Sequence, residues 1–263
     1  MPAYDRSFGA LFRPGRATEL FAGSHSVFRI PKDTRYSHAN AWWLAECCRL
    51  VYRMDDQIKS NGRIAGDIEE IAEREGFRIG VIVSDHDTSS RAAVLQFDRG
   101  FKNQDGSMTV VVFCGSNEPL DWKMNLQANQ AEYLQTARVH SGFLKCLLSI
   151  VDSLLESLRD DAPLYITGHS LGAALATLSS VEFARRGVTL SGCYSFGSPR
   201  VGNRGFSELL EGLNIYRLVN NCDIVTSLPV SIGAIEYRHP DHGIFFDQED
   251  RAYTKISQNF FQQ

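Results

Sequence analysis

A serine between two glycines is the feature of this chain with the clearest chemical meaning. The pentapeptide GHSLG occupies residues 168–172, directly after the apolar run 164–167 and directly before an alanine-rich segment that starts at Ala173. A strand, a tight turn and a helix in that order would hold the serine on an elbow, where the glycines let the backbones cross closely. The helix start also directs free N–H groups at charge that develops in acyl transfer. Ser170 is therefore the predicted nucleophile; the plainer interpretation is a capping serine at a glycine-rich helix start.

An acyl-transfer site also needs two N–H groups that hold the developing oxyanion. The apolar run 109–113 ends in Cys114-Gly115-Ser116, a loop placed as such a donor loop would be. We expect the backbone N–H groups of Ser116 and Leu171 to form the oxyanion hole. A simple β-turn at residues 115–116 is the alternative interpretation.

A carboxylate that orients the base should follow a later parallel strand. The apolar run 215–219 leads directly into Asn220-Asn221-Cys222-Asp223, and the carboxyl ends of parallel strands share one edge of a sheet. Asp223 is therefore the predicted acid, which would hold an imidazole in the correct tautomer. The alternative is an aspartate that merely begins a turn before Pro229.

Hydrophobic periodicity predicts the elements that position these groups. We expect helices at residues 39–52, 66–74, 142–158 and 173–186, and strands at 77–84, 92–97, 108–113, 164–167, 189–196 and 215–219, with a strand-like run at 235–239. The second and third strands are expected to form a hairpin. Strands that alternate with helices in the second half favour a central, mostly parallel mixed sheet with helices on both faces, an α/β fold.

Composition limits the classes of function. The 263 residues, 43% apolar and 22% charged, suit one large domain, which we place at 39–263 behind an N-terminal arm at 1–38. A net charge of −4 gives no basic field for nucleic acid. The chain shows neither a secretory signal nor a membrane-spanning run, which favours a cytoplasmic location. Six cysteines without framework or metal-site spacing favour free buried thiols, and we expect neither metal nor cofactor.

Several linked motifs resemble those of the fungal-type, class 3 lipase family. The resemblance spans about residues 39–245 and rests on VFCGS at 112–116 with Asp121-Trp122, VHSGF at 139–143, TGHSLGAALA at 167–176, and FGSPRVGN at 196–203 leading to NCDIV at 221–225. It implies an α/β-hydrolase fold and the roles of nucleophile for Ser170, acid for Asp223, and oxyanion donors for Ser116 and Leu171. It also implies a mobile lid at 117–126, a stretch that could equally be an ordinary loop and helix. Cys114 stands where the family usually has arginine.

The base histidine is where the chain departs from this family. The family's catalytic histidine lies well beyond the acid, near the carboxyl end, and only His239 and His242 follow Asp223 here. His242 falls in a predicted turn at 240–243, where a triad histidine belongs. His239 lies in a strand-like run and matches a strand histidine that does no chemistry in the family. The remaining alternative is a missing histidine, absent by nature or through truncation, and the terminal pair Phe260-Phe261 favours truncation.

Three functions remain open on this reading. The first is a carboxylic ester hydrolase, a lipase or esterase for triacylglycerol or a related acyl lipid, that works through a serine acyl-enzyme and contacts a lipid interface transiently. The second is a lipid- or acyl-binding module that keeps the fold but lacks its triad histidine. The third is an acyltransferase that passes the acyl group to an alcohol or amine instead of water.

Overall fold

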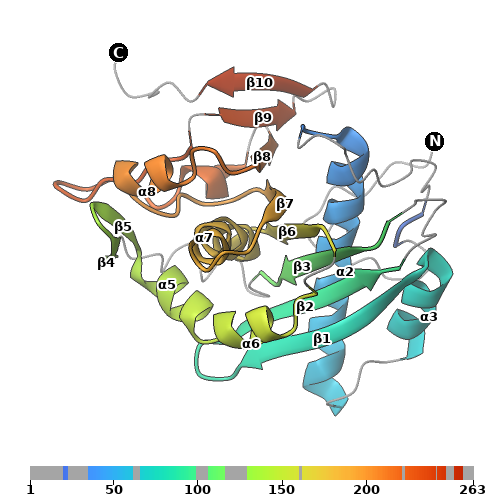
Figure 1. Cartoon of the computed structure of the whole chain (residues 1–263). Helices are drawn as coiled ribbons and strands as arrows, with labels where there is room; N and C mark the ends of the chain where they lie inside the picture. Colours follow the sequence, from blue (N-terminus) through green and yellow to red (C-terminus); the bar gives the residue numbers. More distant parts are fainter. Residues whose placement is uncertain are drawn as a thin grey trace.

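The protein is built around one eight-stranded mixed sheet (Figure 1). The computed structural model describes residues 20–22, 35–61, 66–98, 106–115, 129–159, 162–220, 223–240, 242–246 and 252–256. The strand order is β1-β2-β3-β6-β7-β8-β9-β10. The strands are β1 Phe77–Asp85, β2 Ser90–Phe97, β3 Met108–Phe113, β6 Leu164–His169, β7 Leu190–Phe196, β8 Ile215–Asn220, β9 His242–Phe246 and β10 Ala252–Ile256. The strands from β3 to β9 pair in parallel, whereas β1, β2 and β10 pair antiparallel.

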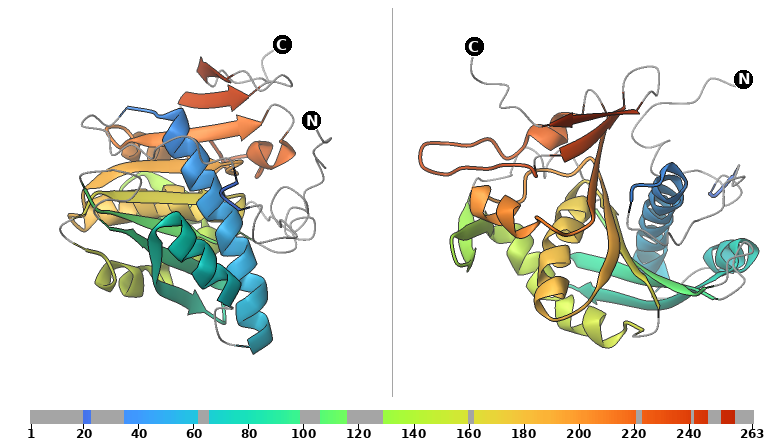
Figure 2. Two further views of the ribbon diagram at one scale, coloured as in Figure 1. Left: turned by 90° about the vertical axis from the view of Figure 1, so that its right-hand side faces the viewer. Right: turned by 45° about the horizontal axis from the view of Figure 1, so that its top comes forward.

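Helices cover both faces of this sheet. Figure 2 shows α2 and α3 on one side of the curved sheet and α5, α6 and α7 on the other. Their bounds are α2 His38–Asn61, α3 Gly66–Glu75, α5 Ser141–Leu148, α6 Val151–Glu156 and α7 Leu171–Arg185. A small hairpin of β4 Gln130–Leu134 and β5 Ala137–His140 packs beside α5 and the short helix α8 Arg204–Leu209. The arrangement is that of an α/β-hydrolase, as predicted.

Alternating side chains divide the core into two clusters, one on each face of the sheet. In β3, Val110 packs into the cluster under α2 and α3, and Val111 packs into the cluster under α5 and α7. Strands that are buried on both faces read as continuous apolar runs, and all six residues of β3 and of β6 are buried. The two core clusters therefore enclose β6, and the turn that follows it, from both sides of the sheet.

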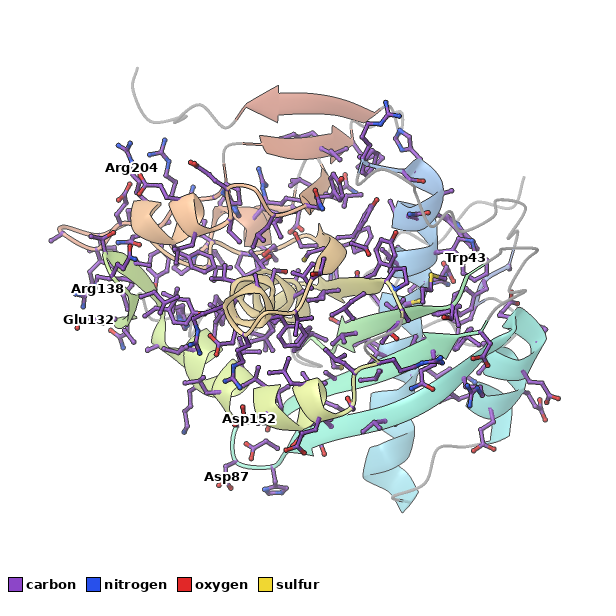
Figure 3. All side chains as sticks on the ribbon, viewed as in Figure 1. Trp43, Asp87, Glu132, Arg138, Asp152 and Arg204 are labelled. Atoms are coloured by element: carbon purple, nitrogen blue, oxygen red, sulfur yellow. The ribbon has the colours of Figure 1, made fainter. Side chains whose placement is uncertain are left out.

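Charged side chains lie around the outside of these layers, as the five labelled charged residues in Figure 3 illustrate, whereas the labelled Trp43 is buried. Arg138 and Glu132 pair at 3.5 Å across the β4–β5 hairpin, and both are largely exposed. Such surface pairs contribute little to stability.

Several element predictions need correction. The helix expected at 39–52 continues to Asn61, because no glycine or proline interrupts the chain before Gly62. The single helix expected at 142–158 is two helices, α5 and α6, which turn at Ser149 and Ile150. The strand expected at 235–239 is wrong, since only isolated bridges occur there, and the strand begins instead at His242. The hairpin β4–β5, helix α8 and strand β10 were not predicted.

Part of the predicted N-terminal arm belongs to the core. Leu20 and Phe21 are buried, and the Phe21 ring lies 5.3 Å from the Trp43 ring and 5.7 Å from the Phe77 ring. The Phe21 N–H also donates to the Glu46 carboxylate at 2.7 Å. Burial of a large apolar side chain stabilises a folded protein by roughly 1.5–3 kcal/mol, so Leu20 and Phe21 together contribute several kcal/mol to the free energy of unfolding. The rest of the arm before residue 35 lies outside the described residues.

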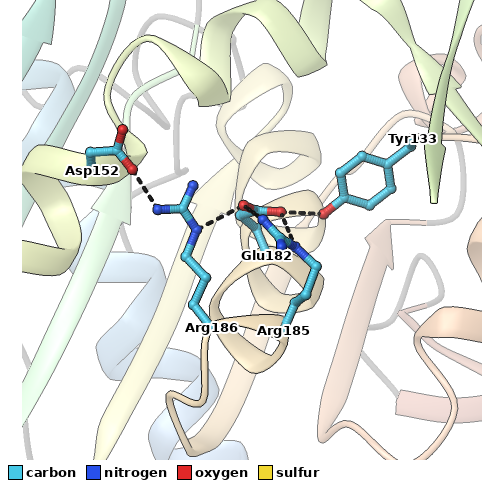
Figure 4. Close-up of polar contacts among 5 residues, drawn as sticks. All are labelled: Tyr133, Asp152, Glu182, Arg185 and Arg186. Carbon is cyan, nitrogen blue, oxygen red and sulfur yellow. Dashed lines mark hydrogen bonds and ion pairs between the residues drawn. The ribbon is translucent and has the colours of Figure 1, made fainter.

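A buried carboxylate ties the β4–β5 hairpin to α7 (Figure 4). Glu182 accepts hydrogen bonds from the Tyr133 hydroxyl at 2.7 Å, from Arg185 at 2.6 Å and from Arg186 at 2.8 Å. Arg186 also pairs with Asp152 of α6. Burial alone would raise the pKa of Glu182, but the hydrogen bonds from Arg185, Tyr133 and Arg186 lower that pKa to about 2. The charged form of Glu182 therefore stabilises the folded protein.

We expect the Glu182 network to make stability depend on pH in the acid range. The folded pKa of Glu182 lies below its ordinary value of 4.5, so its contribution is present above pH 4.5 and is lost as pH falls toward about 2. The loss should be on the order of 3 kcal/mol. Urea unfolding at pH steps from 2 to 6 should show this slope in the wild type and a flatter one in Glu182→Gln.

The matched control for this experiment is Glu208→Gln. Glu208 pairs with Arg204 at 2.9 Å on an exposed helix surface, where such a pair contributes less than about 1 kcal/mol. Its pH profile should follow that of the wild type. Equal slopes for wild type and Glu182→Gln between pH 2 and 4.5 would show that the network carries no such linkage.

Candidate active site

Ser170 occupies a strained turn between β6 and α7. Its backbone has φ 56° and ψ −121°, a conformation that non-glycine residues adopt only when the surroundings impose it. The Ser170 N–H donates to the Phe196 carbonyl of β7 at 3.0 Å, and the residue is 4% exposed. The predicted elbow is therefore present, and the capping interpretation is wrong, because Ser170 makes no side-chain cap hydrogen bond.

The two glycines of the pentapeptide allow this turn to form. A Cβ atom on Gly168 would lie 2.2 Å from the Gly172 carbonyl oxygen, and one on Gly172 would lie 2.3 Å from the Phe113 carbonyl oxygen. Both neighbours are backbone atoms, which cannot rotate away as a flexible side chain can. The close approach brings the start of α7 directly against the end of β3, where the predicted oxyanion loop begins.

The predicted acid lies beside the end of β7. Asp223 Oδ1 accepts the Val225 N–H at 3.0 Å, and Oδ2 lies against Gly197, where a Cβ atom would be only 2.5 Å away. Gly197 has φ 57° and follows Phe196, the residue whose carbonyl accepts the Ser170 N–H. Ser170 and Asp223 are thus gathered around the same two residues, at the carboxyl edge of the parallel strands.

One of the two expected oxyanion donors lies within the described residues. Leu171 is the first residue of α7, and its N–H has no acceptor among the described residues, as expected for the first turn of a helix. Gly115 lies against the elbow, because a Cβ atom there would be 2.8 Å from the His169 carbonyl oxygen. Ser116 and the expected lid at 117–126 lie outside the described residues.

His239 is occupied by a structural contact. Its Nε2 lies 2.6 Å from the Thr226 carbonyl oxygen, to which it donates. Burial lowers the pKa of His239 well below its ordinary value, and the charges of Arg217 and Arg200 lower it further. A neutral imidazole held by a backbone carbonyl is not poised to take a proton from Ser170.

His242 is the first residue of β9 and not part of the predicted turn. The strand register places His169 level with Ile244 of β9. Ser170 lies one residue beyond that level, and His242 lies two residues before it. Along the strand direction the two residues are therefore three residues apart, which is about 10 Å. Across the sheet, from β6 to β9, they are three strand spacings apart, which is about 14 Å. The register therefore speaks against His242 as the base for Ser170.

A tyrosine that sequence reasoning missed contacts the back of the elbow. The Tyr52 hydroxyl of α2 lies 3.1 Å from His169 Nδ1, and a Cβ atom on Gly115 would be 2.0 Å from that hydroxyl. Tyr52 thus touches both the residue before the nucleophile and the loop that leads to Ser116. The sequence offered no signal beyond a tyrosine on the apolar face of a predicted helix.

We expect Tyr52→Phe to weaken this support without abolishing activity. The substitution keeps the ring but leaves a buried imidazole nitrogen with one partner fewer, which costs about 1–3 kcal/mol of unfolding free energy. Urea unfolding should show the loss, and esterase kinetics should change by less than about tenfold, since the elbow backbone is held independently. Tyr36→Phe is the control, because its hydroxyl pairs with His38 at an exposed position; an equal cost for both variants would contradict the prediction.

Two further properties bear on the class of protein. Among the described residues, no helix is both long and apolar enough to cross a membrane. The cysteines in the described part of the chain, Cys47, Cys48, Cys114, Cys146 and Cys193, are free thiols. Burial raises the pKa of Cys48 and of Cys193 to about 12, so these thiols are unreactive core residues, as predicted.

Comparison with known proteins points to one family. A family model described as lipase (class 3) matches residues 110–232. A chloroplastic phospholipase A(1) of Arabidopsis thaliana is 35% identical over 161 residues, which are 51% of this chain and 36% of that protein. A lipase of Rhizomucor miehei is 32% identical over 133 residues, 45% of this chain and 37% of that protein. The chain thus spans little more than a third of the length of these two relatives.

Solved structures share the fold. Lipase II from Rhizopus niveus superposes with a TM-score of 0.65 at 21% identity, over 80% of this chain and 82% of that one. A triacylglycerol lipase whose catalytic centre is described as a serine protease triad gives a TM-score of 0.56 at 27% identity, over 67% and 69% of the two chains. The segment that the class 3 lipase model matches, residues 110–232, includes most of β3, the elbow, and the loop that holds Asp223. Over residues 110–232 the chain is therefore similar to the class 3 lipase family, and its fold is that of the solved lipases.

Proposed function

We propose that the protein is a serine carboxylic ester hydrolase of the lipase or esterase type. The observation that carries the proposal is the strained backbone of Ser170 at the start of α7, beside the Leu171 N–H. Strain of about 1–3 kcal/mol at a non-glycine residue persists where function requires it. Here it raises one hydroxyl from the end of a buried strand to the positive end of a 15-residue helix.

The proposed reaction passes through an acyl-enzyme. Ser170 Oγ attacks the ester carbonyl carbon while a base takes its proton, and the N–H groups of Leu171 and Ser116 bind the oxyanion. The leaving alcohol departs with that proton, and water then hydrolyses the acyl-enzyme by the same route. Asp223 would orient the base and stabilise its charged form. Among the described side chains no histidine stands in this role, so we assign the base to a residue outside them.

The proposed substrates are triacylglycerols or related acyl lipids. The relatives named above are lipases and a phospholipase A(1), and their names supply the substrate class. Because Ser170 is 4% exposed, a substrate reaches it only after neighbouring residues move, which suits transient contact with a lipid interface. We place the protein in a reducing, cytoplasmic setting, because the cysteines of the described part are free.

Labelling with a fluorophosphonate tests the proposal, since the reagent reacts only with an activated serine. We expect the wild type to be labelled at Ser170 and to hydrolyse a p-nitrophenyl ester, and we expect His242→Ala to be labelled equally. Ser179→Ala is the control, because Ser179 is fully buried within α7 and bonds the Ala176 carbonyl. An unlabelled wild type would contradict the proposal.

The second candidate is an acyl-binding module without catalysis. It is favoured by one observation, that the side chains of His140, His169 and His239 are engaged in other hydrogen bonds. This candidate predicts binding of a fatty acyl ligand, no fluorophosphonate labelling, and no difference in ester hydrolysis between wild type and Ser170→Ala.

A further inference from the structure

A buried arginine that has no hydrogen-bonding partner among the described residues lies on the sheet face opposite α2. Arg217 of β8 stands level with Ser195 of β7 and Gly243 of β9, three neighbouring strands in Figure 1. Arg217 is 5% exposed, and its Nε has no hydrogen-bond partner in the described part of the chain. Its other recorded neighbour is the Phe245 ring, 5.4 Å from the guanidinium carbon. The Ser195 hydroxyl beside it is also buried and has no hydrogen-bond partner within the ranges that the structure describes.

These two groups line the same small cavity. The cavity is enclosed by β7, β8, the first half of α7 and residues 238–240, and it offers about 10 Å³ to the centre of a water-sized sphere. That is roughly the room that one water molecule or one small ion needs. His239 also lines it, and among the described lining residues none is an aspartate or glutamate.

The electrostatics of the cavity call for negative charge. Burial and, to a smaller extent, the charge of nearby Arg200 lower the pKa of Arg217 to about 10, so Arg217 stays charged at neutral pH. The side chain of Arg200 itself bonds only the Pro229 carbonyl, at 3.3 Å, within the described residues. A buried charge that no opposite charge compensates costs several kcal/mol. A water would satisfy the orphaned donors, but only an anion would also offset the charge.

We propose that the cavity between Ser195, Arg217 and His239 binds a small monovalent anion of the halide class, with chloride as the natural ligand. Arg217 Nε and the Ser195 hydroxyl would donate to it. Phosphate and sulfate are excluded by size. The site lies on β7 and β8 behind the loops that hold Ser170 and Asp223, so its occupant would stabilise the fold without taking part in the chemistry.

Thermal unfolding of the full chain in different sodium salts tests this site. At equal ionic strength, chloride and bromide should raise Tm above its value in gluconate, an anion too large for the cavity, by about 2–4 °C for each kcal/mol gained on binding. The rise should saturate with halide concentration. Arg217→Met should remove the difference between salts, whereas Arg204→Met, at an exposed position, should keep it. General salt effects act on both variants alike and therefore cancel.

A second measurement keeps the test decisive if Arg217→Met does not fold. Crystals of the wild type grown or soaked in bromide should show an anomalous peak within hydrogen-bond distance of Arg217 Nε, and Ser195→Ala should weaken the halide-dependent rise in Tm. The same Tm in chloride and gluconate, or a cavity that holds only water in bromide, would overturn the proposal.

Discussion

Ser170→Ala should reduce hydrolysis of a p-nitrophenyl ester by at least about a thousandfold, and Ser170→Gly should do the same. Loss of the nucleophile removes the covalent route, and a thousandfold fall corresponds to about 4 kcal/mol of transition-state stabilisation. Residual activity would reflect only binding and the oxyanion donors. The measurement is kcat/KM under conditions in which the wild type is saturable.

Stability separates the two substitutions, because Ser170 has φ 56°. Alanine carries the same Cβ atom and inherits the strain, so Ser170→Ala should unfold at the same urea concentration as the wild type. Glycine adopts this conformation without cost, so Ser170→Gly should gain about 1 kcal/mol or more. An inactive but more stable variant is the expected signature of strain kept for function. Activity of Ser170→Ala within tenfold of the wild type would refute the assignment of the nucleophile.

The elbow was predictable because local sequence determines it. Glycines at 168 and 172 around Ser170 follow an apolar run and precede alanines, and each of these choices agrees with a strand, a tight turn and a thin helix. The position of Asp223, the predicted acid, was predictable for a similar reason, since it follows the last clear apolar run at the carboxyl edge. In both places the predicted functional residue lies at the end of an element whose own pattern is strong.

Contacts between distant segments could not be predicted in this way. Tyr52 reaches His169 across 117 residues of sequence, and Tyr133 reaches Glu182 across 49. His242 looked like a turn residue because Pro240 and Gly243 flank it, yet its pairing with Ile256 of β10 makes it part of a strand. Strand pairing at a sheet edge depends on partners far along the chain, and local propensity is a weak guide there.

Gly172→Ala should destabilise the fold by about 3 kcal/mol or more and abolish most activity. Gly172 lies inside α7, where helix propensity alone would favour alanine by about 1 kcal/mol. The new Cβ atom would, however, lie 2.3 Å from the Phe113 carbonyl oxygen and 2.9 Å from its carbon. Relief requires α7 to move away from β3, which displaces the Ser170 hydroxyl and the Leu171 N–H together, and a 1 Å displacement of catalytic groups can cost about a hundredfold in rate.

Gly187→Ala is the matched control for this effect. Gly187 has φ 83° and nothing within 4 Å of the position of a Cβ atom, so alanine there meets conformational strain alone, about 1–2 kcal/mol. Activity should stay at the wild-type level, because Gly187 ends α7 at the far side from Ser170. Urea unfolding and ester hydrolysis of both variants give the comparison. If Gly172→Ala were as stable and as active as Gly187→Ala, close contact between α7 and β3 could not be what positions the predicted nucleophile. Helix propensity, which favours alanine at position 172, would then not be opposed there by packing of α7 against β3.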